Sequence, residues 1–295
     1  MSPAAGAAVL RLATRGSALA RAQAAMAAAA LHGSAGAGTE LVVLSTDGDR
    51  NPATPISRLE GQGWFTAEIE RALVDGRADI AVHSAKDLPT ELAPHLEISG
   101  LLARADPRDA VVTPGGGGLA ALEQGATVGS SSARRAALLA ELRPDLRCVG
   151  IRGNVDTRLR KLDDGQVDGL LVAAAGLDRV GLAGRIGERL DPRAFVPAPA
   201  QGAIALEAVT GSDAARAAAS VGDQPTTLAV GVERSLLRAL GGGCLLAFGA
   251  WARLEEGALV LSAALEVDGR VRRAELGGDP ARPAELVERV VFALR

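Results

Sequence analysis

Aromatic residues make up only 2% of this 295-residue chain, and it contains no tyrosine. Proteins that hold single-stranded nucleic acid stack the bases on aromatic side chains, so this composition argues against such a function. The formal net charge of -3 also lacks the basic excess that attracts a phosphate backbone. We therefore expect no nucleic-acid partner.

Cysteine and long apolar runs are scarce too. The two cysteines, Cys148 and Cys244, do not make a disulfide framework, which is typical of a reducing cytoplasm. The sequence has no run of about 18 uncharged apolar residues, and its first residues lack the basic segment of an export signal. The sequence therefore predicts a cytoplasmic protein with no membrane partner.

Lysine and histidine are rare, and this shapes the chemistry available. Lys86 and Lys161 are the only lysines, so nearly all the positive charge is arginine, whose planar guanidinium suits carboxylates. With three histidines and two cysteines, none at ligand spacing, we expect no metal site. The hydrophobic content of 48% and the chain length predict two or three domains with a substantial core.

The stretch from Ala78 to Pro89 is the most informative. Ile80 to Val82 reads as a buried parallel strand, and Pro89 disfavours an immediate helix after it. Ligands of open α/β sheets collect beyond the carboxyl ends of strands. We therefore expect four polar side chains to face a crevice: His83, Ser84, Lys86 and Asp87. The alternative is a surface turn with a solvated ion pair.

Strands and helices alternate through the first hundred residues. Strands are expected at 9–13, 40–45, 80–82 and 96–103, and helices at 66–75 and from Ser17 to about Leu31, ending at Gly33. A long loop is expected at 51–63. This order predicts a parallel α/β domain in which Arg15 and Ser17 lie at a strand-to-helix turn that favours anions.

A second α/β pattern follows, with arginines after its strands. Three serines, 130–132, precede a helix predicted from Ala133, and Arg134 and Arg135 lie in its first turn, which indicates an anion site. Strands at 147–151 and 169–173 are each followed by turns that carry further arginines: Arg152, Arg158 and Arg179. Each alone could be a solvated surface residue, but together they predict a pocket for a ligand with several carboxylates.

The remaining sequence predicts a return to the first domain and a small α+β domain. We expect domain 1 at 1–104 and 199–220, domain 2 at 105–198 and domain 3 at 221–295. Domain 3 would hold a helix from Pro225, three strands with a hairpin at Asp268-Gly269, and a helix at 283–294. Cys148 is expected to be an inert core residue, whereas Cys244 follows three glycines in an accessible loop.

Several of these segments, in this order, resemble the porphobilinogen deaminase (hydroxymethylbilane synthase) family. The similarity runs from about Arg11 to Ala252 through six short motifs: residues 11–17, 78–89, 129–135, 152–159, 201–203 and 242–244. It implies two α/β domains like those of periplasmic binding proteins, followed by a small α+β domain. It also implies a monomer with a dipyrromethane cofactor joined covalently to Cys244. Four porphobilinogen molecules would be deaminated and joined head to tail on this primer, then released as hydroxymethylbilane for heme biosynthesis.

The resemblance also assigns roles to individual residues. Asp87 corresponds to the catalytic aspartate, which would assist ammonia loss and stabilise the cationic intermediate. The positions that correspond to cofactor-binding residues are Ser84, Lys86, Asp87, Ser131, Arg134, Arg135, Arg158 and Gly202, besides Cys244. The substrate-binding positions are Arg15, Ser17, Phe65, Arg152, Arg179 and Gln201.

The chain departs from the family pattern at a few positions. Gln62, Trp64, Ala200 and Gly241 stand where lysine, leucine, glycine and glutamate are frequent, and residues 245–248 lack a proline often found there. Two alternatives remain open. A carboxylate-binding protein without catalysis would explain the arginines but not Cys244 or Asp87. A phosphoryl-handling enzyme would use the 130–132 serines, but the sequence lacks a Walker-type lysine.

Overall fold

The computed structural model describes residues 9–45, 66–242 and 246–295. These residues divide into two compact units. The first unit comprises residues 9–45, 66–104 and 203–227, and the second comprises residues 105–202, 228–242 and 246–295. The second unit therefore contains the segment that we assigned to domain 2, residues 199–202 of domain 1, and the segment assigned to domain 3 except residues 221–227, which belong to the first unit. The division into three domains stays a prediction.

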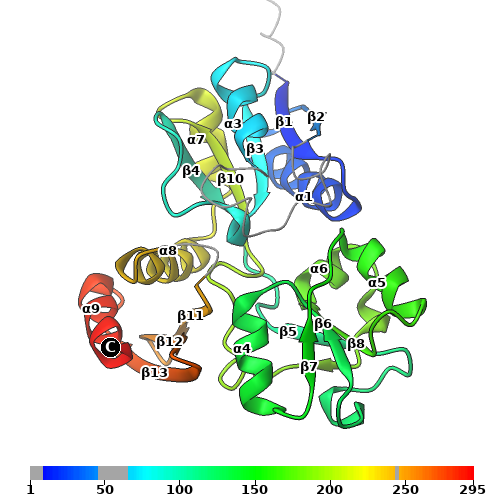
Figure 1. Cartoon of the computed structure of the whole chain (residues 1–295). Helices are drawn as coiled ribbons and strands as arrows, with labels where there is room; N and C mark the ends of the chain where they lie inside the picture. The colour runs from blue at the N-terminus through cyan, green and yellow to red at the C-terminus, as the bar shows by residue number, and fades with distance from the viewer. Residues whose placement is uncertain (1–8, 46–65, 243–245) are drawn as a thin grey trace, which may run out of the picture. The chain divides into compact units, whose positions relative to one another are not determined.

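A five-stranded mixed sheet forms the centre of the first unit (Figure 1), with the order β2-β1-β3-β10-β4. Its strands are β1 (Leu10–Arg15), β2 (Thr39–Leu44), β3 (Ile80–Ser84), β4 (Leu96–Leu101) and β10 (Ile204–Val209). β1 runs parallel to β2 and β3, but β10 lies antiparallel between β3 and β4. The parallel layout expected for the strands at 9–13, 40–45 and 80–82 is therefore confirmed, whereas the returning strand β10 inserts in the opposite direction.

Side chains that point alternately to the two faces of this sheet pack against helices on both sides. Leu12, Ile80 and Val82 pack with α1 (Ala18–Ala35) and α7 (Asp213–Ser220) in one cluster. Ala13 and Ala81 point to the other face and pack with α3 (Ala67–Val74). Successive strand residues point to opposite faces, so a central strand with both faces covered is apolar throughout.

Local signals set the ends of α1, with one difference from expectation. The Ser17 hydroxyl accepts the Ala20 N–H at 3.2 Å, as an N-cap does. The helix continues past Gly33 and ends at Gly36, whose φ of 60° is left-handed and whose N–H donates to the His32 carbonyl. The predicted stop at Gly33 is wrong, because the left-handed cap that ends a helix forms three residues later.

The second unit contains another five-stranded mixed sheet, with the order β7-β6-β8-β5-β9. Its strands are β5 (Asp109–Val112), β6 (Thr127–Gly129), β7 (Arg147–Val149), β8 (Gly169–Ala173) and β9 (Glu188–Arg189). α4 (Ala133–Leu142) packs on one face, and α5 (Val155–Asp163) and α6 (Ala174–Arg179) pack on the other. The sequence predicted a turn at 174–179, where the structure has the short helix α6.

The C-terminal part of the second unit is a three-stranded antiparallel sheet with α8 (Gln224–Ala239) and α9 (Pro283–Leu294). The strands are β11 (Phe248–Glu255), β12 (Ala258–Val267) and β13 (Arg270–Gly278). Asp268 and Gly269 have φ angles of 52° and 77°, so the predicted hairpin turn is confirmed. The predicted fold class, two α/β sheets followed by a small α+β part, is confirmed.

Candidate functional site

Two strands of the first unit bring candidate residues to one edge of its sheet. β1 and β3 are parallel neighbours with Ala13 beside Ala81, so their carboxyl ends meet at the same edge. β1 ends at Arg15, and Ser17 follows as the cap of α1. β3 ends at Ser84. This edge therefore holds the first group of predicted site residues: Arg15, Ser17, Ser84, Lys86 and Asp87.

A single 3-10 turn, Ala85–Asp87, presents the lysine and the aspartate. Ala85 is buried and its N–H donates to the Ala203 carbonyl, whereas Lys86 is half-buried and Asp87 is exposed. Leu88 is extended, with a ψ of 138°, as expected for the residue before a proline. The turn thus holds its backbone in the core while the Asp87 carboxylate remains accessible to a ligand.

Ser84 is held by a residue that the sequence analysis missed. Gln23 of α1 is buried, and its side-chain amide lies 2.9 Å (Nε2) from the Ser84 Oγ. A glutamine in the alanine-rich stretch of α1, close to Arg21, was the available signal. Gln23 therefore orients the Ser84 hydroxyl from the helix side of the sheet.

His83 does not face a crevice, and that expectation is wrong. Its side chain is buried, and its Nε2 lies 3.0 Å from Oε2 of Glu207, which is fully buried on β10. The reason is the strand geometry: β3 is covered on both faces, so His83 points into the sheet's α3 side with Ala81. The pair is internal to the first unit.

In the second unit, β5 begins at the edge of the sheet where β6, β7 and β8 end. β6 is parallel to β7 and β8, and β5 starts there because it is antiparallel to β8, with Asp109 paired to Ala173. The segments after the parallel strands carry the second group of predicted site residues: Ser131, Arg134, Arg135, Arg152, Arg158 and Arg179. The predicted convergence of these arginine-bearing segments at one sheet edge matches the observed topology.

Asp109 lies at the centre of a buried cluster at this edge, which we call the Asp109 cluster (Asp109, Arg134, Arg135 and Gln201). Arg134 donates through Nη1 to Oδ2 at 2.7 Å and through Nη2 to Oδ1 at 3.2 Å. Arg135 donates through Nε to Oδ1 at 2.8 Å, and Gln201 Nε2 lies 3.2 Å from the same oxygen. Asp109 is fully buried, and Arg134 and Arg135 are only 4% and 6% exposed.

The charges of the Asp109 cluster do not balance. Burial by itself would raise the pKa of Asp109, but the positive charges and hydrogen bonds of Arg134 and Arg135 hold it well below its usual value. Two guanidinium groups then share one carboxylate, which leaves one unit of positive charge in excess. Burial lowers the pKa of Arg134. An anion would compensate this excess, so the cluster favours a ligand with carboxylates.

This arrangement changes the expected picture of Arg134 and Arg135. We expected them at a helix start, where backbone, hydroxyl and charge would act on a ligand together. Ser132 does cap α4, accepting the Arg135 N–H at 3.4 Å, but both guanidinium groups turn inward to Asp109 and to backbone carbonyls of Val196 and Leu171. The burial of two helix-start arginines is explained by a carboxylate partner that the sequence analysis missed.

The turn at 200–202 adjoins the cluster. Gln201 Nε2 donates to the Pro107 carbonyl at 2.8 Å, and Arg179 Nη2 donates to the Gly202 carbonyl at 2.6 Å. Gly202 has a φ of 92°, and a Cβ there would lie 2.6 Å from the Ala105 carbonyl oxygen. Only glycine fits this position, because any other residue would strain the left-handed backbone and clash with the Ala105 carbonyl oxygen.

The side chains of Arg158 and Ser131 donate to nearby backbone carbonyls, and the Arg152 carbonyl accepts a hydrogen bond from Lys161. Arg158 Nε donates to the Gly153 carbonyl at 2.8 Å, and Lys161 Nζ donates to the Arg152 carbonyl at 3.2 Å. Ser131 Oγ donates to the Ile151 carbonyl at 2.6 Å. Arg152 and Arg158 are half-buried, so each exposes part of a guanidinium side chain at this edge.

Three predictions concern residues outside the described part of the chain: Phe65, Cys244 and the loop at 51–63. Cys148 is described, on β7, where burial raises the pKa of its thiol and it packs against one core cluster. It is therefore a poor nucleophile, as expected. Among the described residues, no group of histidine, cysteine and carboxylate side chains could hold a metal ion.

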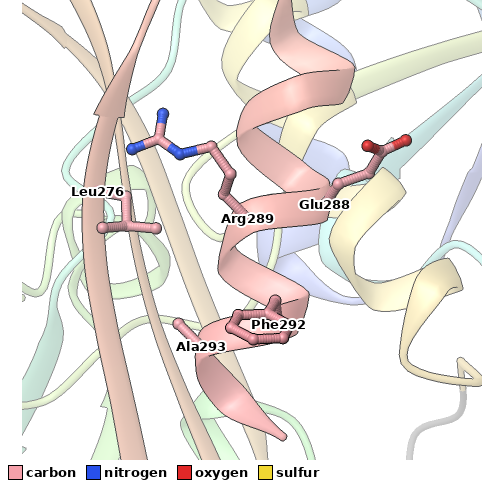
Figure 2. A pocket seen from close by; sticks show the side chains of 5 residues that line it. All are labelled: Leu276, Glu288, Arg289, Phe292 and Ala293. Carbon is pink, nitrogen blue, oxygen red and sulfur yellow. The ribbon is translucent and has the colours of Figure 1, made fainter.

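A shallow pocket in the C-terminal part of the second unit lies between β13 and α9 (Figure 2). It is lined by Leu276, Glu288, Arg289, Phe292 and Ala293, none of which is a predicted site residue. Figure 2 shows Arg289 reaching from α9 towards Leu276 of β13. The pocket offers one apolar ring and no converging polar groups, so the strand ends remain the better candidate site.

Comparison with known proteins gives consistent matches. The family model described as porphobilinogen deaminase, dipyromethane cofactor binding domain, matches residues 10–217, and the model of the porphobilinogen deaminase C-terminal domain matches residues 227–295. The chain is 43% identical over 282 residues to the porphobilinogen deaminase of Syntrophobacter fumaroxidans, covering 94% of this chain and 91% of the relative. It is 47% identical over 271 residues to that of Sorangium cellulosum, covering 90% of each chain.

Among solved structures, the chain is similar to the methionine binding protein MetQ, with a TM-score of 0.49 and 13% identity. That match covers 84% of this chain and 99% of the other. No helix within residues 9–45, 66–242 and 246–295 is long and apolar enough to cross a membrane.

Proposed function

Because the chain belongs to the porphobilinogen deaminase family, we propose that it acts as hydroxymethylbilane synthase, a transferase. It deaminates porphobilinogen and joins four of these molecules head to tail on a dipyrromethane primer. The product, hydroxymethylbilane, enters heme biosynthesis. The structural observation that carries this proposal is the excess positive charge of the Asp109 cluster, which lies at the edge where the other arginines follow their strands.

The residues at this edge fit an acidic cofactor. Each pyrrole of a dipyrromethane carries an acetate and a propionate, and arginine binds carboxylates through two parallel N–H donors. Within the described part of the chain, the buried Nε of Arg134 and of Arg179 have no hydrogen-bond partner. We propose that Arg134, Arg135 and Arg158 of the second unit bind the cofactor's acid groups, together with Ser131 and Gly202. In the first unit, Ser84, Lys86 and Asp87 would take this role.

When bound, the dipyrromethane supplies the pyrrole carbon to which the next ring is joined. We assign its covalent attachment to the Cys244 thiol, a residue outside the described part of the chain. Arg15, Ser17, Phe65, Arg152, Arg179 and Gln201 are proposed to bind porphobilinogen. The three arginines, Ser17 and Gln201 would hold the acid side chains of the incoming ring, and Phe65 would stack or pack near that ring.

Asp87 is the proposed catalytic residue. Its carboxylate is exposed at the end of the turn after β3, so it can accept pyrrole N–H groups and hold the proton that ammonia loss requires. A fixed negative charge also stabilises the positive charge that develops on the ring as the amine leaves. Lys86, its neighbour in the turn, offers a cation for the acid groups. Asp87 would thus stabilise the positive charge on the ring, and Lys86 would anchor the ligand.

We further propose that the protein works as a cytoplasmic monomer with neither nucleic acid nor membrane as a partner. The net charge of -3 and the small aromatic content support the absence of a nucleic-acid partner. The rival function, carboxylate binding without chemistry, uses the same arginines but needs neither Asp87 nor Cys244.

One experiment separates these functions. The purified protein is weighed intact, its cysteines are mapped by peptide analysis, and hydroxymethylbilane formation from porphobilinogen is measured. We expect a mass increase equal to a dipyrromethane on Cys244, with product formed. An unmodified Cys244 in protein that forms no product would support the binding protein, and product formation without the adduct would overturn the assigned attachment.

A further inference from the structure

Glu233 of α8 holds two separate pieces of backbone with one buried carboxylate. Its side chain is fully buried. Oε2 accepts the Ala200 N–H at 2.6 Å, and Oε1 accepts the Ala252 N–H of β11 at 2.7 Å. Hydrogen bonds to a carboxylate are short and strong, and here both oxygens are used. Glu233 therefore joins α8 and β11 to the turn at 200–202.

The turn that Glu233 holds contains a strained residue. Ala200 is buried and has a φ of 61°, a left-handed conformation that side chains other than glycine rarely adopt. Glycine would reach this conformation without the steric cost of a Cβ. An alanine in this conformation persists only when its surroundings hold it there. The hydrogen bond from its N–H to Glu233 restrains Ala200 directly, and the bond from the Gln201 N–H to the Ala198 carbonyl closes the same turn.

Beyond Ala200, the turn meets the proposed ligand-binding residues directly. The next residue, Gln201, reaches Asp109, the common partner of Arg134 and Arg135. The carbonyl of Gly202 accepts a hydrogen bond from Arg179. A turn that relaxes at Ala200 would therefore shift both contacts and, with them, the guanidinium groups that they orient.

We propose that Glu233 is a positioning residue for carboxylate binding. By fixing the left-handed turn at Ala200, it holds Gln201 and Gly202 where they contact Asp109 and Arg179. This inference rests on the proposed function of that site. Glu233 lies outside residues 10–217, which the cofactor-binding family model matches. The C-terminal part of the chain thus contributes to ligand binding through a helix residue that need not touch the ligand.

Glu233→Gln is the matched perturbation, because it keeps the shape but replaces one accepting oxygen by an NH₂ group that opposes a backbone N–H. We expect the turn to populate its left-handed form about tenfold less, since a left-handed alanine is disfavoured by about that factor. Because only the competent fraction binds, KM for porphobilinogen should rise about tenfold, and the fraction of protein carrying the cofactor adduct should fall.

Two further variants show whether the effect passes through the turn. Ala200→Gly removes the strain, so in the Glu233→Gln background it should restore KM and the adduct fraction to near the wild-type values. Glu188→Gln is the control: Glu188 accepts the backbone N–H of Leu119 at 2.8 Å in the same unit but has no contact with the turn among its described hydrogen bonds. It should leave KM and adduct fraction unchanged.

The measurements are intact mass, KM and kcat, and the melting temperature of each variant, taken on the full chain. A raised KM in Glu233→Gln that Ala200→Gly reverses supports the proposal. Wild-type KM and adduct fraction in Glu233→Gln, or a loss that Ala200→Gly does not reverse, overturns it. If Glu233→Gln does not fold, the double variant decides: it supports the proposal when it folds and binds, and opposes it otherwise. If instead the proposed function is wrong, the wild-type protein itself will lack the adduct and form no product, which distinguishes that result from a failure of the Glu233 proposal.

Discussion

Replacing Asp109 by asparagine tests the physical basis of the carboxylate site. The change keeps the side-chain volume but removes the only negative charge of the Asp109 cluster. The buried guanidinium groups of Arg134 and Arg135 would then have no negative charge to compensate them. The asparagine oxygen can still accept the three hydrogen bonds that Oδ1 receives, but its NH₂ group would face the Nη1 donor of Arg134.

The cost follows from burial. Removing one partner of a buried ion pair destabilises a protein by about 3–5 kcal/mol, because the remaining charge stays buried without its counterion. For a domain of 150–250 residues, 1 kcal/mol lowers the melting temperature by about 2–4 °C, so a decrease of about 6–20 °C is expected. The uncompensated charge, rather than the single lost hydrogen bond, supplies most of this cost.

Thermal unfolding of the full chain, followed by circular dichroism at neutral pH, measures the effect. Asp168→Asn is the control, because the Asp168 carboxylate also accepts hydrogen bonds, from the Thr127 N–H and hydroxyl at 2.7 Å each, yet its site is exposed. It should lower the melting temperature by only a few degrees. Adding Arg134→Met to Asp109→Asn returns the cluster to one excess positive charge and should recover about 0.5–3 kcal/mol, the usual range of coupling between contacting residues.

The recovery is the decisive comparison. If Asp109→Asn melts within 2 °C of the wild-type protein (about the effect of 1 kcal/mol), the buried pair does not stabilise the unit. If the double variant is less stable than Asp109→Asn, the cost is one of packing and not of charge. Either result would refute the reasoning from excess positive charge.

Three other predictions use the same structure. Gly202→Ala should destabilise the folded protein by about 2–5 kcal/mol, because the alanine would be left-handed and would clash with the Ala105 carbonyl. Gly165 has a φ of 73° but open space around it, so Gly165→Ala should show the backbone cost alone in the same melting assay. The stability that the Asp109 carboxylate contributes should be complete above its ordinary pKa of 3.8 and should be lost as the pH falls from there towards its lower folded-state pKa. In this pH range the melting temperature should fall less steeply with pH in Asp109→Asn than in the wild-type protein. Parallel curves for the two proteins would contradict this. Asp87→Asn, reconstituted with preformed cofactor, should fold normally and turn over about 10²–10³-fold more slowly; a turnover within about threefold of wild type would remove Asp87 from its catalytic role.

Much of the local structure was readable from the sequence. The cap at Ser17, the Asp268-Gly269 hairpin and the closing helix at 283–294 all formed where predicted. Each depends on residues within a few positions of one another, through a capping hydroxyl, two left-handed turn residues or a helical repeat of apolar positions. The positions of the arginines after strand ends were equally local, since strand ends are marked by a change from apolar to polar residues.

What the sequence by itself determined is therefore where the elements lie and which chemistry their ends carry: arginines that would bind carboxylates follow several strands, and an aspartate follows one. What only the tertiary structure decided is which charges meet. Asp109 and Arg134 are 25 positions apart, Ala200 and Glu233 are 33 apart, and His83 and Glu207 are 124 apart. These pairs form because β5 starts opposite the end of β8, because β10 inserts antiparallel beside β3, and because α8 packs behind the 200–202 turn. Strand order and direction depend on the burial of whole faces, which no short stretch of sequence encodes.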